Sequence, residues 1–413
     1  MERLIFHVDV NSAFLSWEAA KRVAQGEEDL RQIPSAIGGD REKRTGVILA
    51  KSIPAKRHGV ITGEPIAAAL RKCPDLVLAR PDFALYERNS KAFMDVCRKY
   101  APVVEQYSID ECFLDMTGTG KLYPDPIAVA TAIKDEIRDV LGFTVNVGIG
   151  NNKLLAKMAS DFEKPDKVHT LFSREINEKM WPLAVRELFS VGASTADRLE
   201  RAYIRTIGDL AKAEPSFLQA LVGEKMGSYI HRFANGMDDS PVLSAPEEAK
   251  GYSNSTTLAT DVTTFEEAYR ILLMLADSVT SRMRADNTKA YCVGITIRGN
   301  DFKDRSHQKK LNEPTDITTE IFSVAKSLFL ELWDRKTPLR LLGLSLTQLH
   351  RGEEFQLSLF RDEDRERERR VDRVVDSIRS QFGFDTIKRG SACEFSENIG
   401  KKYKAHMENE TKK

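Results

Sequence analysis

Leu4-Ile5-Phe6-His7-Val8-Asp9 and Tyr107-Ser108-Ile109-Asp110-Glu111 are the two stretches that decide the fold. Each places acidic residues at the end of an apolar run rich in β-forming residues. Two carboxylates ~4 Å apart at an effective dielectric near 20 repel by roughly 4 kcal/mol, so convergent acids need a shared cation. Mg²⁺ prefers oxygen ligands and commonly completes its shell with substrate phosphates. The two stretches therefore predict a magnesium site.

The adjacent acids Asp110 and Glu111 constrain where this site can lie. Neighbouring residues on a regular strand point to opposite faces, so both can face one ion only from a strand end or hairpin tip. We place them between strands at 103–107 and 112–116. Taken alone, Asp9 can be a strand-end cap and the acidic pair a solvated turn. The rest of the chain favours a two-metal site, which can stabilise the attacking and leaving oxygens of nucleotidyl transfer.

Length and composition predict a multidomain globular protein. The chain has 413 residues, of which 41% are hydrophobic, and its 62 basic residues balance 62 acidic ones. Any nucleic-acid-binding surface must therefore be local. No run approaches a membrane-spanning length and the N-terminus lacks a signal-peptide pattern, so we expect a cytoplasmic protein without membrane contact. The five cysteines lack zinc-site spacing and are expected to be reduced.

The first part of the chain predicts a βαββαβ order, with an insertion after the first helix. The elements are a strand at 1–10, helices at 14–25, 83–100 and 125–141, the two strands flanking the acidic pair, and a strand at 143–149. In this split βαβ arrangement the first strand and the central hairpin can lie side by side. Asp9 would then lie beside Asp110 and Glu111.

The second part predicts helices, a linker and another βαββαβ unit. Residues 170–240 are expected to form helices and turns only, and a proline-containing linker follows at 244–250. The second unit has strands at 252–258, 289–298, 302–311 and 339–349, with helices at 264–285 and 317–334. It lacks paired acids at its hairpin and is therefore expected to bind rather than catalyse. Helical spacing predicts one amphipathic helix in the charged C-terminal segment, with the apolar residues Val371, Val374, Val375 and Ile378.

Three motifs in chain order carry a family resemblance: Asp9-Val10-Asn11-Ser12-Ala13-Phe14, Tyr107-Ser108-Ile109-Asp110-Glu111 and Val147-Gly148-Ile149-Gly150-Asn151-Asn152-Lys153. Over about residues 3–360 the chain resembles the Y-family translesion DNA polymerases. The resemblance implies an α+β, multidomain right-hand polymerase. Its expected parts are a palm at 1–12 and 77–168, fingers at 13–76, a helical thumb at 169–240, a little finger at 250–351, and a clamp-binding peptide with a charged helical tail at 352–413.

The resemblance also implies the catalytic centre. Asp9 and Asp110 would bind two Mg²⁺ ions, Glu111 would complete the site, and the Val10 carbonyl would help to hold the nucleotide-side metal. No segment resembles a proofreading exonuclease.

Four residues are expected at the nucleotide. Phe14, next to Ala13, falls at the family's steric gate, where an aromatic ring excludes a ribose 2′-hydroxyl; a core aromatic is the alternative. Lys153 would bind the triphosphate, although it can also be a solvated helix residue. Where the commoner family pattern has a tyrosine and an arginine, this chain has Ile53 and Lys56, so Lys56 supplies charge and the tyrosine hydroxyl is missing. Lys56 and the Asp-Val-Asn opening look more like the polymerase V catalytic subunit type than polymerase IV.

Two regions are expected to contact DNA. Residues 189–199 and 204–210 resemble a helix-hairpin-helix, a motif that offers backbone N–H groups to a DNA phosphate. Gly192 is present, and Ser194 replaces the second glycine of the motif. A plain helical turn is the alternative. The second hairpin carries five basic residues and two acidic ones, a local net charge of +3: Arg298, Lys303, Arg305, Lys309 and Lys310 against Asp301 and Asp304. It is either a salt-sensitive, sequence-independent DNA surface or an ordinary charged sheet face.

Gln356-Leu357-Ser358-Leu359-Phe360 resembles the pentapeptide by which bacterial replication proteins dock into the sliding clamp. Gln356, Leu357, Leu359 and Phe360 would make the contacts, with the apolar side chains as anchors. A chance match is the alternative.

Together these features predict a monomeric polymerase that extends a primer on template DNA with deoxynucleoside triphosphates, at low fidelity and past lesions. Two other functions stay open. One is a catalytically inactive, clamp-tethered mutagenesis scaffold of the same fold, against which the intact acids argue. The other is a palm-type nucleotidyl cyclase, which has no use for the clamp peptide or the second βαββαβ unit.

Overall fold

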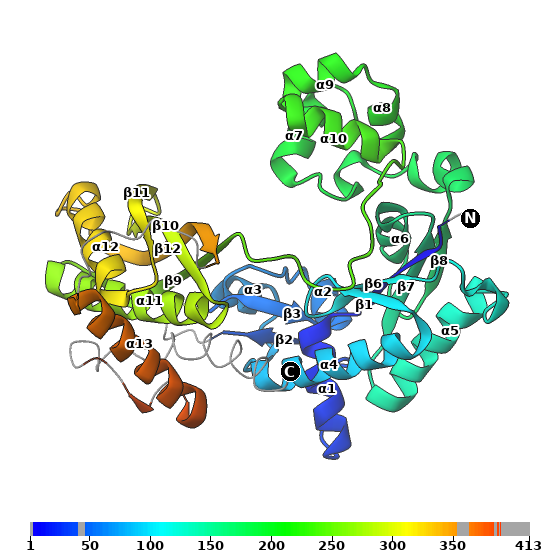
Figure 1. The fold of residues 1–413 in the computed structure, drawn as a ribbon. Helices are drawn as coiled ribbons and strands as arrows, with labels where there is room; N and C mark the ends of the chain where they lie inside the picture. The colour runs from blue at the N-terminus through cyan, green and yellow to red at the C-terminus, as the bar shows by residue number, and fades with distance from the viewer. Residues whose placement is uncertain (1–2, 40–45, 353–362, 384–385, 388, 390–413) are drawn as a thin grey trace. The chain divides into compact units, whose positions relative to one another are not determined.

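The computed structural model describes residues 3–39, 46–352, 363–383, 386–387 and 389. These residues form two compact units, one drawn from the chain up to Pro246 and the other from Glu247 onward (Figure 1). No helix in the described ranges combines the length and apolarity that a membrane crossing needs.

A five-stranded sheet organises the first unit. Its order is β5 (Val103–Gln106), β6 (Glu111–Asp115), β1 (Ile5–Val10), β7 (Val145–Gly150) and β8 (Val168–Leu171). β1 is antiparallel to both β6 and β7, and its register sets Asp9 opposite Glu111. The predicted neighbourhood of the first strand and the hairpin is thus confirmed.

Helices cover both faces of this sheet. α4 (Phe83–Tyr100) and α5 (Pro126–Glu136, continued by a π turn at Ile137–Leu141) share a core with Phe6, Val8 and Val10 on one face. α6 (Lys153–Ser160) covers the opposite face, where Ala156 packs on Ile5 and Phe113 (Figure 1). The alternation of β1 therefore directs Asp9 to the α6 face.

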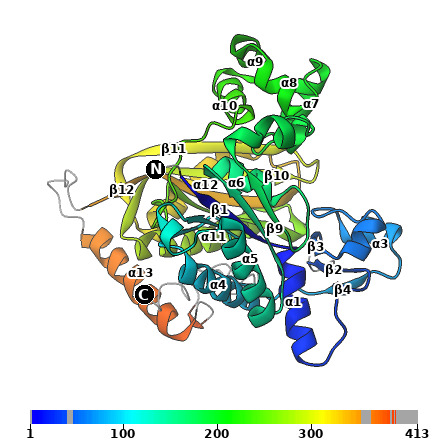
Figure 2. The same cartoon turned by 90° about the vertical axis from the view of Figure 1, so that its right-hand side faces the viewer.

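A smaller sheet lies in the insertion. It has the order β3 (Ile48–Lys51), β2 (Ser35–Gly38) and β4 (Val77–Ala79), with α1 (Ala13–Ala24) before it and α2 (Ile53–Arg57) and α3 (Ile66–Lys72) within it (Figure 2). β4 pairs with β2, so this sheet extends to Ala79, beyond the expected boundary at 76.

The strand β8 was not predicted, whereas the prediction of helices and turns from about residue 170 to 240 is confirmed after it. β8 ends at Leu171 and pairs in parallel with β7. A four-residue edge strand is too short to show a two-residue alternation, so the sequence pattern gave no signal for it. Helices and turns then follow around their own core: 3₁₀ turns Ser173–Glu175 and Val185–Glu187, a π turn Ile176–Met180, α7 (Ala193–Arg201), α8 (Ile207–Lys212), α9 (Pro215–Val222) and α10 (Glu224–Ala234). A further 3₁₀ turn, Thr119–Lys121, precedes α5.

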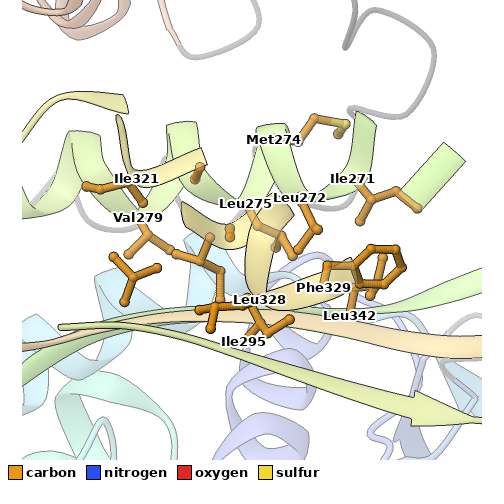
Figure 3. Packing of buried hydrophobic residues seen from close by; sticks show 14 of the residues in the cluster. Ile271, Leu272, Met274, Leu275, Val279, Ile295, Ile321, Leu328, Phe329 and Leu342 are labelled. Atoms are coloured by element: carbon orange, nitrogen blue, oxygen red, sulfur yellow. The ribbon is translucent and has the colours of Figure 1, made fainter. Parts of the chain in front are cut away.

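The second unit confirms the predicted second βαββαβ pattern. Its sheet order is β11 (Asp304–Thr315), β10 (Thr288–Gly299), β12 (Leu339–Arg351) and β9 (Gly251–Val262). α11 (Phe265–Ala285) and α12 (Thr318–Leu332) pack on this sheet. Figure 3 shows Leu272 and Leu275 of α11 pointing toward Ile295 and Leu342 of the sheet.

The predicted C-terminal helix is present as α13 (Glu363–Phe382), and its apolar residues Val375 and Ile378 are half-buried. Val371 and Val374 are 51% and 59% exposed, whereas Asp372 and Arg379 are buried. Arg379 lies 2.6 Å from Asp277 of α11. Buried charges must be paired, and this helix docks by pairing its charges with those of α11.

The backbones of α6 and β7 approach each other closely at two glycines of β7. A Cβ added to Gly148 would lie 2.0 Å from the Ala156 carbonyl oxygen and 2.4 Å from the Ser160 nitrogen. A Cβ on Gly150 would lie 2.7 Å from the Ala156 nitrogen. Backbone atoms cannot rotate away as a flexible side chain can, so the two glycines fix the height of α6 above the sheet.

Gly148→Ala is expected to lower the free energy of unfolding by about 3 kcal/mol, because overpacking against backbone forces the helix to shift. Urea denaturation followed by circular dichroism measures this. Gly120→Ala is the control, since a Cβ there meets nothing within 4 Å. Equal stability of the two variants would contradict the tight contact.

Candidate active site

The three predicted acids gather where β1 ends and β6 begins. Asp9 is 6% exposed and lies opposite Glu111. Asp110 immediately precedes β6, and its carbonyl oxygen accepts a 3.0 Å hydrogen bond from the Val10 nitrogen. The Asp110 carboxylate accepts a 2.7 Å hydrogen bond from the Ser108 hydroxyl. The strand-end position deduced from the adjacent acids is therefore where the structure places them.

Asp9 is paired with a lysine that follows α6. The Lys164 ammonium donates a hydrogen bond to Asp9 and lies 2.8 Å from Asp161. Burial raises the pKa of Asp9 above its usual value even though Lys164 acts to lower it. Burial alone would lower the pKa of Lys164, but Asp9 and Asp161 outweigh it and raise that pKa.

Glu111 is paired with groups from β1 and α6. Its Oε2 lies 3.2 Å from His7 Nε2 and 2.9 Å from Lys157 Nζ. Burial acts to raise the pKa of Glu111, but the His7 and Lys157 contacts outweigh burial and lower that pKa to about 2. Burial also lowers the pKa of His7, which favours an uncharged ring at neutral pH.

The oxygen atoms of the site suit a hard cation, although the acidic side chains do not form one ligand cluster. In the described ranges, no three His, Cys, Asp or Glu side chains form a group that could hold a metal ion. Two of the three acids instead contact lysines. Carboxylates and the Val10 carbonyl are the oxygen ligands that Mg²⁺ takes, and the lysines supply the positive charge that the acids need.

Lys153 lies elsewhere on the α6 face. Its ammonium is 2.7 and 2.8 Å from the two carboxylate oxygens of Glu105 and 4.7 Å from the centroid of the Phe113 ring. Its charge is therefore neutralised by Glu105, and the lysines that contact the proposed catalytic acids are Lys157 and Lys164.

Sequence reasoning missed three neighbours of the acids. His7 had a usable signal, because it lies two residues before Asp9 on the same strand and so shares its face. Lys157 had a weaker signal: it lies four residues after Lys153 on the same helix and so shares its face. Lys164 had none, because its contact with Asp9 joins distant parts of the chain.

Phe14 belongs to an aromatic cluster on α1 and α4. Its half-buried ring stacks on Tyr86 with centroids 4.6 Å apart and 12° between planes, and meets the edge of Phe83 at 6.2 Å. Ala13 beside it is buried. The ring is thus held firmly, with part of its surface open, which suits both the gate and the core alternative.

Ile53 and Lys56 both lie on α2. Ser52 caps this helix by accepting a hydrogen bond from the Ala55 nitrogen. Ile53 is 48% exposed and Lys56 is exposed. The short helix therefore presents a lysine and an uncovered apolar side chain.

The residues expected to contact DNA differ in exposure and in whether a carboxylate already pairs with them. Gly192 caps the N-terminus of α7, with Ser194 in its first turn. Arg298 pairs with Asp304 at 2.5 Å and Arg305 with Asp334 at 3.0 Å, so the predicted +3 strip is partly neutralised. Lys303, Lys309 and Lys310 are exposed at or beside the edge strand β11.

Comparison with known proteins gives the family. The model of the impB/mucB/samB family matches residues 8–161, and the model of that family's C-terminal domain matches residues 249–359. The model of the DNA polymerase-iota thumb domain matches residues 186–238. A DNA polymerase IV of Clostridium acetobutylicum is 43% identical over 398 residues, covering 96% of this chain and 100% of the relative. DNA polymerase IV 2 of Bacillus subtilis is 36% identical, covering 98% of this chain and 99% of the relative.

A solved structure agrees in fold. A Y-family DNA polymerase chimera of Dbh and Dpo4 superposes with a TM-score of 0.73 at 22% identity, covering 84% of this chain and 100% of the chimera. The leaning toward the polymerase V type is corrected, because the relatives cited are polymerases IV and the Asp-Val-Asn opening with Lys56 was too small a sample to separate the types. The chain belongs to the DNA polymerase IV group of the Y-family translesion polymerases, which are DNA-directed DNA polymerases of α+β fold.

Proposed function

We propose that Asp9, Asp110 and Glu111 are the catalytic centre of low-fidelity translesion synthesis by two-metal nucleotidyl transfer. The observation that carries this proposal is the register that sets Asp9 opposite Glu111, with the Asp110 peptide bonded to Val10. Asp9, Asp110 and the Val10 carbonyl would hold the nucleotide-side ion, and both aspartates with Glu111 the primer-side ion. Bound there, Mg²⁺ would activate the primer 3′-hydroxyl and stabilise the leaving pyrophosphate.

The surrounding parts would serve this centre as palm, fingers, thumb and little finger. Gly192 and Ser194 at the start of α7 would meet a DNA phosphate through backbone N–H groups. The exposed lysines of the second hairpin would follow the DNA backbone, aided by Arg298 and Arg305 if DNA phosphates displace their carboxylate partners. We also propose that the protein is cytoplasmic. One chain supplies every residue of the proposed centre, so we propose a monomer, which sedimentation with and without DNA can test.

Asp110→Ala is expected to reduce primer extension by about 1,000-fold or more, a barrier increase of at least ~4 kcal/mol, while DNA binding is retained. Primer extension with Mg²⁺ and gel-shift titration measure the two effects. Asp115→Asn, at the far end of β6, is the matched control. Unchanged extension by Asp110→Ala would remove the assigned centre. A wild-type chain without extension activity would favour the scaffold, and cyclic nucleotide formation would favour the cyclase.

Phe14→Ala is expected to admit ribonucleotides, because removing the ring opens space for a 2′-hydroxyl. Incorporation of ATP and dATP opposite thymine measures the sugar selectivity. Phe83→Ala is the control, since Phe83 belongs to the same aromatic cluster. If both variants lose stability and neither changes selectivity, Phe14 is a core aromatic only.

We propose that Lys164 is the main triphosphate ligand, with Lys153 as a second candidate. Lys164 contacts Asp9, and a metal bound to Asp9 would displace the ammonium toward the phosphates of the same nucleotide. Lys56 would add charge from α2.

Lys164→Ala is expected to raise the KM for deoxynucleotide by about tenfold, equal to ~1.4 kcal/mol, with a smaller effect for Lys153→Ala. Steady-state kinetics on one primer-template compares them. The opposite order would return the role to Lys153.

The clamp peptide 356–360 lies outside the described residues, so its proposed docking rests on the sequence. Deleting it is expected to reduce synthesis only when a sliding clamp is loaded on the template. An equal loss of primer extension without clamp would point to a folding role.

A further inference from the structure

We propose that His7 and Lys157 are positioning residues that hold Glu111 by one carboxylate oxygen and leave the other for the reaction, an inference that rests on the proposed function of Glu111. His7 Nε2 and Lys157 Nζ both contact Oε2, at 3.2 and 2.9 Å. Neither contact falls on Oε1. Glu111 would then act through one oxygen in a fixed orientation.

The histidine is built into the sheet for this role. Its side chain is fully buried, its ring lies 4.7 Å from that of Phe113, and its Nδ1 is 2.8 Å from the Ser160 hydroxyl. A carboxylate only accepts hydrogen bonds, so Nε2 must carry the proton. Nδ1, on the other side of the ring, contacts the Ser160 hydroxyl, so the ring is held between Glu111 and α6.

Lys157 and Ser160 both come from α6, whose height is set by Gly148. The Ser160 hydroxyl also lies 2.8 Å from the Lys157 carbonyl oxygen. The ring, the hydroxyl and the ammonium therefore form one unit whose position depends on the contact between α6 and β7. A displacement of the helix would release Glu111 from both partners.

A core histidine that merely fills space is the competing explanation, and two substitutions separate them. His7→Phe keeps a ring of similar shape without the hydrogen bond. His7→Gln keeps an N–H that can reach the carboxylate. Only the positioning role predicts recovery with glutamine. Lys157→Met and Lys157→Arg form a matching pair, and Lys99→Met controls for loss of an exposed lysine paired with a glutamate.

The experiment measures kcat, the KM for deoxynucleotide, thermal unfolding and Mn²⁺ binding by the full chain on a dideoxy-terminated primer-template. Mn²⁺ is followed by electron paramagnetic resonance, which needs no turnover. Loss of a group that orients a metal ligand costs roughly 10–100-fold in affinity or activity. His7→Phe and Lys157→Met should therefore lower kcat and weaken Mn²⁺ binding by about tenfold or more, with KM little changed. His7→Gln should restore most of both.

Two results would overturn the positioning role. In one, His7→Phe stays within twofold of wild type in kcat and Mn²⁺ binding while Glu111→Gln is inactive. In the other, His7→Phe and His7→Gln lose kcat equally and in proportion to a lowered melting temperature. Full activity of Glu111→Gln would instead remove the proposed function of Glu111 itself, so the two failures are distinguishable.

Discussion

The arrangement of the site depends on a backbone-to-backbone contact between α6 and β7. Gly148 and Gly150 allow this contact because any Cβ would collide with α6 backbone atoms. At this distance the helix brings Lys157 and Ser160 over β1 and β6, and the turn after it brings Lys164 to Asp9. A contact that carries no chemistry thus sets where three chemical groups lie.

Lysines supply part of the positive charge that the convergent acids need. Convergent carboxylates need positive charge, and the expectation was a shared Mg²⁺. The structure provides a lysine for Asp9 and another for Glu111, whereas the Asp110 carboxylate accepts a hydrogen bond from the Ser108 hydroxyl. The same carboxylates keep the oxygen chemistry that a hard cation takes.

Much of the fold followed from periodicity, because long elements repeat their pattern often enough to be seen. The helix at 83–100 and both βαββαβ orders are of this kind, and the strand-end argument placed the acids correctly. The strand β8 was not predicted because four residues are too few to show an alternating pattern. The helix α13 was predicted, but the burial of its Arg379 was not, because that burial depends on Asp277 of α11, which a hydrophobic pattern does not contain. The contact of Lys164 with Asp9 was not predicted for the same reason, because the two residues are far apart in the sequence.

Lys164, which contacts Asp9, connects the fold to the proposed reaction. A divalent ion bound to Asp9 would compete with the Lys164 ammonium for the oxygens of that carboxylate, because the two cations repel each other at contact distance. If a metal ion took its place at Asp9, Lys164 would still be tethered beside the site, where its charge would suit the proposed binding of a triphosphate. In this chain, where Ile53 supplies no hydroxyl, a lysine released by metal binding would add to the charge from Lys56. Metal binding and triphosphate binding would then favour each other. The ion would free Lys164 from Asp9, and the triphosphate would stabilise both the ion and the freed lysine.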